Sequence, residues 1–321
     1  MKLLIVGKVA SITHWLEDCA AAWRDEGHEV AVAATRNPAL HASIEALLLS
    51  ERLGAPLAAG IVRQARRLAP NLIVAVGAYH IPTLVLERLA DLPGRCPMVG
   101  WVGDLFSLAA ERAAGRLDAV AYTDSGLLAL HERLGLACPA AWLPHAVNPR
   151  AGRGVGSHGS RRPRLAFVAN PTEQRRRVVA EITWPVSLYG PGWTTACGAH
   201  HDVHARRVRP SAVPAIYAAH LAALNIKNEH NVLTGLNQRS FEPYLSGTPV
   251  LSDAQGDLER CFEPGREVLV WRDSGELNDA YGALRADPAV AAAIGAAGRK
   301  RVLAEHTYAR RLETLASMMG S

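Results

Sequence analysis

The stretch LNIKNEHNVLTGLNQRSFEPYLSGTPVLSD, residues Leu224–Asp253, places two apolar runs on either side of a polar loop and a helical pattern. The apolar runs predict buried strands at Ala222–Ile226 and Pro249–Ser252. The pattern between them predicts a helix over Asn237–Leu245, with Gly247 as its C-terminal cap. The order strand, loop, helix, strand is typical of a parallel α/β sheet covered by helices.

The junction between this loop and helix combines Gly235, Asn237 and Arg239, and the carboxylate of Glu242 follows about one helical turn later. A helix N-terminus offers unpaired N–H groups and a positive dipole end to an anion. Arg239 adds a fork of donors for phosphate oxygens, and Glu242 can accept hydrogen bonds from sugar hydroxyls. Together they indicate a nucleotide or nucleotide-sugar site. The competing interpretation is turn geometry together with a surface i,i+3 ion pair.

The totals describe an ordinary globular protein with room for two domains. The chain has 321 residues, 49% hydrophobic and 20% charged, which suits two domains of about 150 residues each. No apolar run approaches the length of a membrane span, and the N-terminus reads as a first strand instead of a signal peptide. Five cysteines, odd in number and widely spaced, favour a reducing compartment. We therefore predict a cytoplasmic protein without a transmembrane segment.

The net charge of +5 comes with arginine clusters at Arg150–Arg177 and Arg206–Arg209. Clusters of this kind can meet acidic lipids, nucleic acid or anionic substrates. Peripheral contact with an acidic surface is one expectation, and a solvated basic surface is the other.

Both halves of the chain alternate strand and helix patterns. In the first half, strands are predicted at Leu3–Val6, Glu29–Ala34, Leu72–Val76, Met98–Val102 and Ala119–Tyr122, and helices at Thr13–Glu26, Pro82–Ala90 and Ser125–Leu134. In the second half, further strands are predicted at Leu165–Ala169, Val186–Tyr189 and Val268–Trp271, and further helices at Thr172–Glu181, Val213–Ala219, Glu276–Arg285, Pro288–Glu305 and Tyr308–Met319. This alternation predicts two doubly wound parallel sheets.

A stretch rich in Gly, Ser, Arg and Pro between the halves marks a linker. The predicted organisation is a Rossmann-like domain at 1–150, a linker at 151–163, a second Rossmann-like domain at 164–306 and a C-terminal helix at 307–321. Parallel sheets bind ligands at the carboxyl ends of their strands, where the strand order reverses. Two such domains in tandem are expected to face each other across a cleft.

Several pieces of the second half carry a resemblance to a known family. They are Tyr189–Trp193, Pro214–Tyr217, Leu224–Ile226, Gly235–Arg239, Phe241–Glu242, Ser246–Val250, Phe262–Gly265, Gly298–Val302 and His306–Tyr308. In this order and spacing they resemble the GT-B glycosyltransferases of the "glycosyl transferases group 1" C-terminal type, the spore-maturation-like ones in particular. The resemblance implies a GT-B fold, with the nucleotide-sugar donor on the C-terminal domain, the acceptor on the N-terminal domain, and the last helix crossing back to the N-terminal domain.

Many members of this family carry a Glu-x7-Glu motif whose second carboxylate contacts the nucleotide ribose. Glu242 matches the second position, whereas the first falls on Thr234, so the sequence departs from the motif. The departure leaves the sugar and the stereochemical course open.

Glycosyl transfer needs charge stabilisation on the leaving diphosphate and, for inversion, a base on the acceptor hydroxyl. The predicted donor-binding residues are Gly190, Lys227, Gly235, Asn237, Arg239 and Glu242. The candidate bases are Asp104, His14 and His80, each near the end of a predicted strand. The chain has no Asp-x-Asp motif, and the run with His200, His201 and His204 has the pattern of a loop and short strand, so no metal and no cofactor are expected.

The predicted function is a metal-independent glycosyltransferase that uses a nucleotide-diphosphate sugar. Its acceptor is left open among glycans, lipids, metabolites, proteins and modified nucleic acid. Two alternatives are a cytoplasmic two-domain nucleotide-sugar binding protein without turnover and a GT-B-like epimerase. A binder would release the donor intact, whereas many transferases slowly hydrolyse it.

Overall fold

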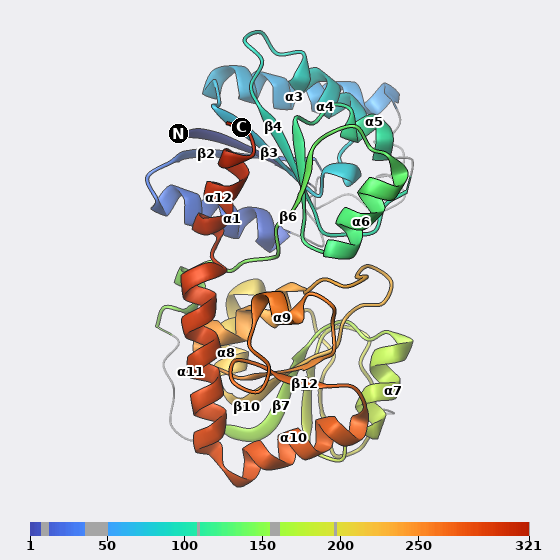
Figure 1. Ribbon diagram of the computed structural model, residues 1–321, viewed down its shortest axis with the longest axis vertical. Helices are drawn as coiled ribbons and strands as arrows, with labels where there is room; N and C mark the ends of the chain where they lie inside the picture. The colour runs from blue at the N-terminus through green and yellow to red at the C-terminus, as the bar shows by residue number, and fades with distance from the viewer. Residues whose placement is uncertain (8–12, 36–50, 108–109, 155–160, 196–197, 321) are drawn as a thin grey trace. The chain divides into compact units, whose positions relative to one another are not determined.

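The computed structural model describes residues 1–7, 13–35, 51–107, 110–154, 161–195 and 198–320, with the side chains of residues 13–14 and 51–54 left out. The chain forms two compact units, which Figure 1 shows. Unit 1 comprises Met1–Pro144 and Tyr308–Ser321, and unit 2 comprises His145–Thr307. Each unit contains one six-stranded sheet.

The sheet of unit 1 has the order β2-β1-β3-β4-β5-β6, and every neighbouring pair is parallel. Its strands are β1 (Lys2–Gly7), β2 (Glu29–Ala34), β3 (Leu72–Val76), β4 (Met98–Val102), β5 (Ala119–Tyr122) and β6 (Ala140–Trp142). The first connection runs from β1 to β2 and the next returns past β1 to β3. The strand order therefore reverses between β1 and β3, which makes their carboxyl ends the ligand-binding edge of this sheet.

The helices of unit 1 are α1 (Thr13–Asp25), α3 (Glu51–Leu68), α4 (Thr83–Ala90), α5 (Glu111–Ala114), α6 (Ser125–Leu134) and α12 (Tyr308–Ser317), with the 3-10 turn η1 (Ala78–His80) after β3. The apolar face of α1, which includes Trp15 and Trp23, is buried. The indole of Trp23 donates to the Tyr308 carbonyl at 2.7 Å, and the buried Arg311 donates to the Pro144 carbonyl at 2.7 Å. These bonds hold α12 beside α1, as Figure 1 shows.

The sheet of unit 2 has the order β12-β11-β10-β7-β8-β9 and is also parallel throughout. Its strands are β7 (Arg162–Val168), β8 (Val186–Tyr189), β9 (Asp202–His204), β10 (His220–Asn225), β11 (Val250–Asp253) and β12 (Leu269–Trp271). The chain runs outward from β7 to β9 and then returns to β10 on the other side of β7. The reversal between β7 and β10 makes their carboxyl ends the second ligand-binding edge.

The longer helices of unit 2 are α7 (Glu173–Glu181), α10 (Ser274–Ala286) and α11 (Pro288–Glu305), and the shorter elements are α8 (Val213–Ala218), α9 (Leu258–Cys261), η3 (Pro149–Gly152), η5 (Pro210–Ala212), η6 (Gln238–Ser240) and η7 (Glu242–Ser246). Helix α11 packs on η7 through glycines. A Cβ on Gly295 would lie 2.1 Å from the Gly247 carbonyl oxygen, and one on Gly298 would lie 2.1 Å from the Tyr244 ring. Only glycine allows this approach.

The predicted helix over Asn237–Leu245 is wrong. The segment instead forms the two 3-10 turns η6 and η7, which meet at Phe241. Proline at position 243 explains the difference, because it lacks an N–H and its ring clashes with the carbonyl four residues earlier. It also disfavours the α conformation for Glu242. The anion-attracting dipole of a full α-helix is therefore missing from this junction.

Three other differences concern the start of unit 2 and two elements of unit 1. Strand β7 begins at Arg162, so it includes the last two residues of the stretch that was read as a linker, of which residues 155–160 lie outside the described part. No element was predicted for α3, where Pro56 and Gly60 interrupt the helical pattern. Strand β6 is only three residues long, and it too was not predicted.

Candidate functional site

A buried arginine spans the point where the strand order of unit 2 reverses. Arg175 lies in the first turn of α7, which is capped by the Thr172 hydroxyl. Its guanidinium donates to the Asn170 carbonyl after β7 at 2.9 Å, and to the Ile226 carbonyl after β10 at 3.0 and 3.3 Å. Arg175 is only 4% exposed.

A second arginine, Arg239, lies close to the first. Burial and, to a smaller extent, the positive charge of Arg239 lower the pKa of Arg175 to about 9, and Asp253 opposes both effects. Burial also lowers the pKa of Arg239, against the opposing influence of Tyr217, Glu242 and Asp253. Both groups stay cationic at neutral pH. A buried and a half-buried cation thus lie close together, an arrangement that an anion would stabilise.

The buried Nε of Arg239 has no hydrogen-bond partner among the described residues. A buried charged donor without a partner costs free energy, so such groups are rare in folded proteins. The backbone N–H of the same residue is satisfied, since it donates to Asn237 Oδ1 at 2.9 Å. The side chain therefore keeps one buried donor for a ligand.

A polar network holds the loop that leads to Arg239. Asn225 is fully buried at the end of β10, and it donates to Ser240 Oγ at 3.0 Å and to Ser252 Oγ at 3.2 Å. Its own side-chain oxygen accepts from Asn237 Nδ2 at 3.1 Å. Asn237 thus joins the strand to the turn η6, which it also caps. A polar Asn within a buried apolar strand was the sequence signal for this network, and the sequence analysis did not use it.

Asp253, at the end of β11, fixes the start of the same loop. Its carboxylate accepts from the Lys227 backbone N–H at 3.0 and 3.2 Å and from Gln255 Nε2 at 2.8 Å. Burial raises its pKa, and these hydrogen bonds and the charge of Lys227 oppose the rise. The structure therefore brings Lys227, Asn237 and Arg239 together around Asp253 and Asn225, and the buried Gly235 lies in the same loop.

The predicted donor residue Gly190 lies at the end of β8, and its φ of 142° and close packing require glycine. A Cβ there would lie 2.4 Å from the Ala169 carbonyl oxygen after β7. The same carbonyl accepts from the Trp193 indole at 2.6 Å. Arg176, next to Arg175 on α7, donates to the Gly192 carbonyl at 2.6 Å. These bonds hold the Gly190–Gly192 turn next to the start of α7, which carries Arg175.

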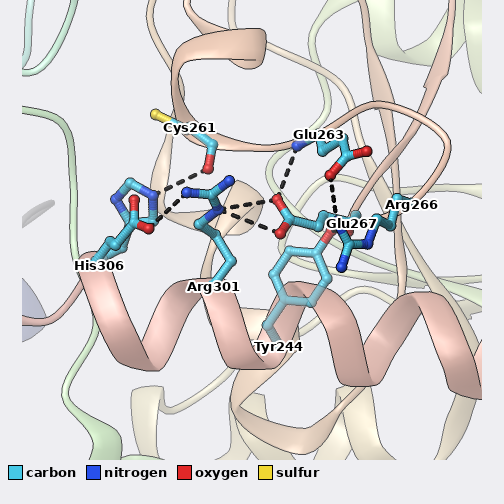
Figure 2. Close-up of polar contacts among 8 residues, drawn as sticks. Tyr244, Cys261, Glu263, Arg266, Glu267, Arg301 and His306 are labelled. Carbon is cyan, nitrogen blue, oxygen red and sulfur yellow. Dashed lines mark hydrogen bonds and ion pairs between the residues drawn. The ribbon is translucent and has the colours of Figure 1, made fainter.

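The remaining predicted donor residue, Glu242, is the first residue of η7, and Tyr244 of the same turn lies beside the polar network that Figure 2 shows. The Tyr244 hydroxyl donates to the Glu267 carbonyl at 2.5 Å. The Glu267 carboxylate accepts from Arg301 Nε on α11 at 3.1 and 3.3 Å and from the Glu263 N–H at 2.9 Å. These bonds tie η7, the loop after α9 and α11 into one framework that positions Glu242.

Two of the three predicted bases lie together in unit 1. His80, in η1 after β3, places its Nε2 3.6 Å from Asp104 Oδ2, which follows β4. Their side chains are 43% and 37% exposed, so both are open to solvent. The side chain of His14 lies outside the described residues.

The histidine run after β8 serves the structure of unit 2. His201 bonds the Val179 carbonyl through Nε2 at 3.1 Å and accepts from the Val186 N–H at 3.2 Å. His200 contacts the Ile182 carbonyl at 3.0 Å. Within the described ranges, no three His, Cys, Asp or Glu side chains gather in a way that would hold a metal ion.

A model of a known protein family matches the second half of the chain. Residues 168–317 match the family model described as "Glycosyl transferase-like". This match runs from the last residue of β7 to the end of α12, and it includes Arg175, Arg239 and Glu242.

The chain carries a glycosyl transferase-like domain. The match confirms the predicted enzyme class, a glycosyltransferase, for the second half of the chain. The spore-maturation subtype stays a prediction. A search of curated proteins finds no match.

Solved structures share the fold over the whole chain. The sucrose-phosphate synthase of Thermosynechococcus elongatus superposes with a TM-score of 0.70 at 14% identity, covering 100% of this chain and 97% of that one. HepE of Anabaena, solved in complex with UDP, gives a TM-score of 0.70 at 14% identity and 100% coverage of both chains. A glycosyltransferase of Rickettsia africae gives 0.70 at 8% identity, covering 99% and 98%. At these identities the likeness shows the fold, and it confirms the predicted two-sheet α/β class.

A search of the described residues for a helix that is long and apolar enough to cross a membrane finds none.

Proposed function

We propose that the protein transfers a sugar from a nucleotide-diphosphate sugar to a hydroxyl acceptor, and that Arg175 and Arg239 mark the place of the donor diphosphate. The observation that carries this proposal is the unpartnered, buried Nε of Arg239 beside a second buried arginine. Both lie at the edge where the strand order of the sheet reverses, which is where α/β sheets bind ligands. HepE, which shares the fold, binds UDP and UDP-glucose, so we propose a UDP-sugar as the first donor to test.

Each predicted donor residue receives a role in this proposal. Arg239 donates to a phosphate oxygen, and Lys227 with the backbone from Gly235 to Asn237 lines the same anion. Glu242, the first residue of η7, accepts hydrogen bonds from the ribose hydroxyls. Gly190 allows the nucleotide end of the donor to approach the backbone after β8.

Charge on the leaving diphosphate is neutralised by side chains in this scheme. The two 3-10 turns supply little dipole, so Arg175, Arg239 and Lys227 carry the stabilisation as charge develops. Three cationic side chains around one diphosphate make a metal-independent reaction our proposal. Retained activity in excess EDTA supports this part, and activity that returns only with a divalent cation contradicts it.

We assign the base to His80, with Asp104 as the group that orients its ring. In the proposed step the acceptor oxygen attacks the anomeric carbon, the bond to the diphosphate oxygen breaks, and the acceptor proton moves to His80. His14 remains the alternative base. Replacing His80 by Gln should lower transfer at least about a hundredfold and leave the donor affinity unchanged.

The experiment is a donor assay with UDP-glucose, UDP-N-acetylglucosamine, GDP-mannose and TDP-glucose, with free nucleotide measured by chromatography. We expect slow release of the nucleoside diphosphate from at least one donor, and loss of that release in Arg239→Met. Binding of a donor that is recovered intact after long incubation would support a binding protein without turnover. Conversion to an epimeric nucleotide-sugar would support an epimerase.

The compartment and the acceptor belong to the proposal as well. We propose a cytoplasmic location, because five cysteines, odd in number and widely spaced, favour a reducing compartment. Peripheral contact of the arginine-rich surface with an acidic surface stays a prediction, and co-sedimentation with anionic lipid vesicles tests it.

A further inference from the structure

A line of hydrogen bonds runs from the surface of unit 1 into its interior. The Tyr79 hydroxyl bonds the Tyr122 hydroxyl at 2.5 Å, and the Tyr122 hydroxyl bonds His131 Nδ1 at 2.9 Å. On its other side, His131 Nε2 lies 3.0 Å from the Cys138 carbonyl oxygen. Tyr122 and His131 are buried, whereas Tyr79 is partly exposed. The outer end of the line is therefore Tyr79.

The inner end fixes the direction of every bond in the line. A carbonyl oxygen only accepts, so His131 carries its proton on Nε2. In a neutral imidazole one ring nitrogen donates and the other accepts, so Nδ1 accepts from the Tyr122 hydroxyl.

The direction of this bond determines the directions of the two hydroxyl hydrogen bonds farther out. Because Nδ1 accepts, Tyr122 donates its only hydroxyl proton to His131. The Tyr122 oxygen then accepts the proton of Tyr79. Burial raises the pKa of both phenols, so both keep their protons across the physiological range. The Tyr79 hydroxyl has thus used its only proton inside the protein, and its oxygen can only accept from a ligand.

Aromatic packing holds this arrangement in place. The Phe106 ring stacks on Tyr122 with centroids 5.4 Å apart and meets Tyr79 edge-on at 4.9 Å. Tyr79 and His80 are consecutive residues of η1, at the edge where the strand order of unit 1 reverses. An obligate acceptor therefore lies in the same turn as the proposed base.

We propose that the Tyr79 oxygen accepts a hydrogen bond from a second hydroxyl of the acceptor, which makes the acceptor a polyol such as a sugar. This inference rests on the proposed function. One hydroxyl of the acceptor gives its proton to the base, and the second donates a hydrogen bond to the Tyr79 oxygen. A group that offers only lone pairs, such as a carboxylate or a phosphate, would meet the Tyr79 oxygen without a proton between them and is disfavoured there.

The donor-to-acceptor direction of these hydrogen bonds is tested first, by long-range ¹H–¹⁵N spectra of histidine-labelled full-length protein. We expect His131, assigned by comparison with His131→Gln, to show the neutral tautomer with its proton on Nε2. A proton on Nδ1, or a doubly protonated ring at pH 7.5, would overturn the inference, because Tyr79 would then be able to donate.

The polyol is tested by saturation-transfer titration with methyl β-D-glucopyranoside, with sodium acetate at equal concentration as the acceptor-only probe. We expect the glucoside to bind and Tyr79→Phe to weaken it about three- to tenfold, as for one lost hydrogen bond. Tyr281→Phe is the matched control, since the Tyr281 hydroxyl has no hydrogen-bond partner among the described residues. Absence of glucoside binding, equal affinity in Tyr79→Phe, or preference for acetate would overturn the proposal.

The two proposals fail in different measurements. UDP binding by the wild type tests the donor residues of unit 2, whereas glucoside binding tests Tyr79 in unit 1. Loss of glucoside recognition with normal UDP binding therefore supports the inference, whereas absence of UDP binding in the wild type contradicts the proposed function alone.

Discussion

The side-chain amide of Asn237 donates to the side-chain oxygen of Asn225 across 3.1 Å, which joins the loop before Arg239 to the buried end of β10. Asn237 also caps η6 by accepting from the Arg239 N–H. One residue therefore sets both the position of the loop and the backbone of Arg239.

Replacing Asn237 by Ala should weaken UDP binding about three- to tenfold and lower the stability of unit 2 by about 1–3 kcal/mol. The reason is that Asn225 loses a buried partner and η6 loses its cap. Calorimetric titration and chemical denaturation measure the two effects. Asn278→Ala is the control, because Asn278 bonds Glu181, the last residue of α7, and Thr183, which follows that helix. Unchanged UDP affinity in Asn237→Ala would contradict the role of the network.

Replacing Gly298 by Ala should destabilise the protein by about 1–3 kcal/mol, because the new methyl group meets the buried Tyr244 ring. Since Tyr244 belongs to η7, the same change should also displace Glu242 and reduce UDP affinity. Gly60→Ala in α3 is a matched helical control, with only the Arg63 side-chain end within 4 Å of the new Cβ. It should leave stability unchanged or raise it by up to about 1 kcal/mol. Equal stabilities of the two variants would refute the close packing.

Stability should fall as the pH is lowered below neutrality. Burial lowers the pKa of His201 and of His220 below the ordinary value of 6.5. The unfolded chain then binds protons that the folded chain does not, so this stability is present above about pH 6.5 and is lost as the pH falls through the lowered values. Urea midpoints at pH 8, 6.5 and 5 measure the trend. The slope should be shallower in His201→Gln, whose amide can keep both hydrogen bonds, and an identical slope would argue against this origin.

Much of the fold follows from sequence patterns. Glu29–Ala34 and Leu72–Val76 match β2 and β3 because buried parallel strands are continuous apolar or β-branched runs. Ser125–Leu134 and Pro288–Glu305 match α6 and α11, since Asp124 and Asp287 cap their first turns. The predicted helix over Asn237–Leu245 does not form, because Pro243 interrupts its hydrogen-bond pattern despite the apolar periodicity.

The candidate site was only partly predictable. Arg239, Asn237 and Lys227 are distinctive in the sequence because they follow a buried strand. Arg175 was not, because three consecutive arginines give no indication of which one turns inward. The partners of Asn225 and of Tyr79 come from strands and turns far apart in the chain, so their hydrogen bonds exist only once the sheets are formed.

The central claim concerns the buried, unpartnered Nε of Arg239, and titration of UDP into wild type and Arg239→Met tests it most directly. A charge-assisted bond to phosphate predicts that the variant binds UDP at least about tenfold more weakly. Because an unpartnered buried donor is removed, the melting temperature of the variant should be no lower than that of the wild type. Equal UDP affinity in the two proteins, or normal affinity with a lowered melting temperature, would show that Arg239 is structural and contradict the account.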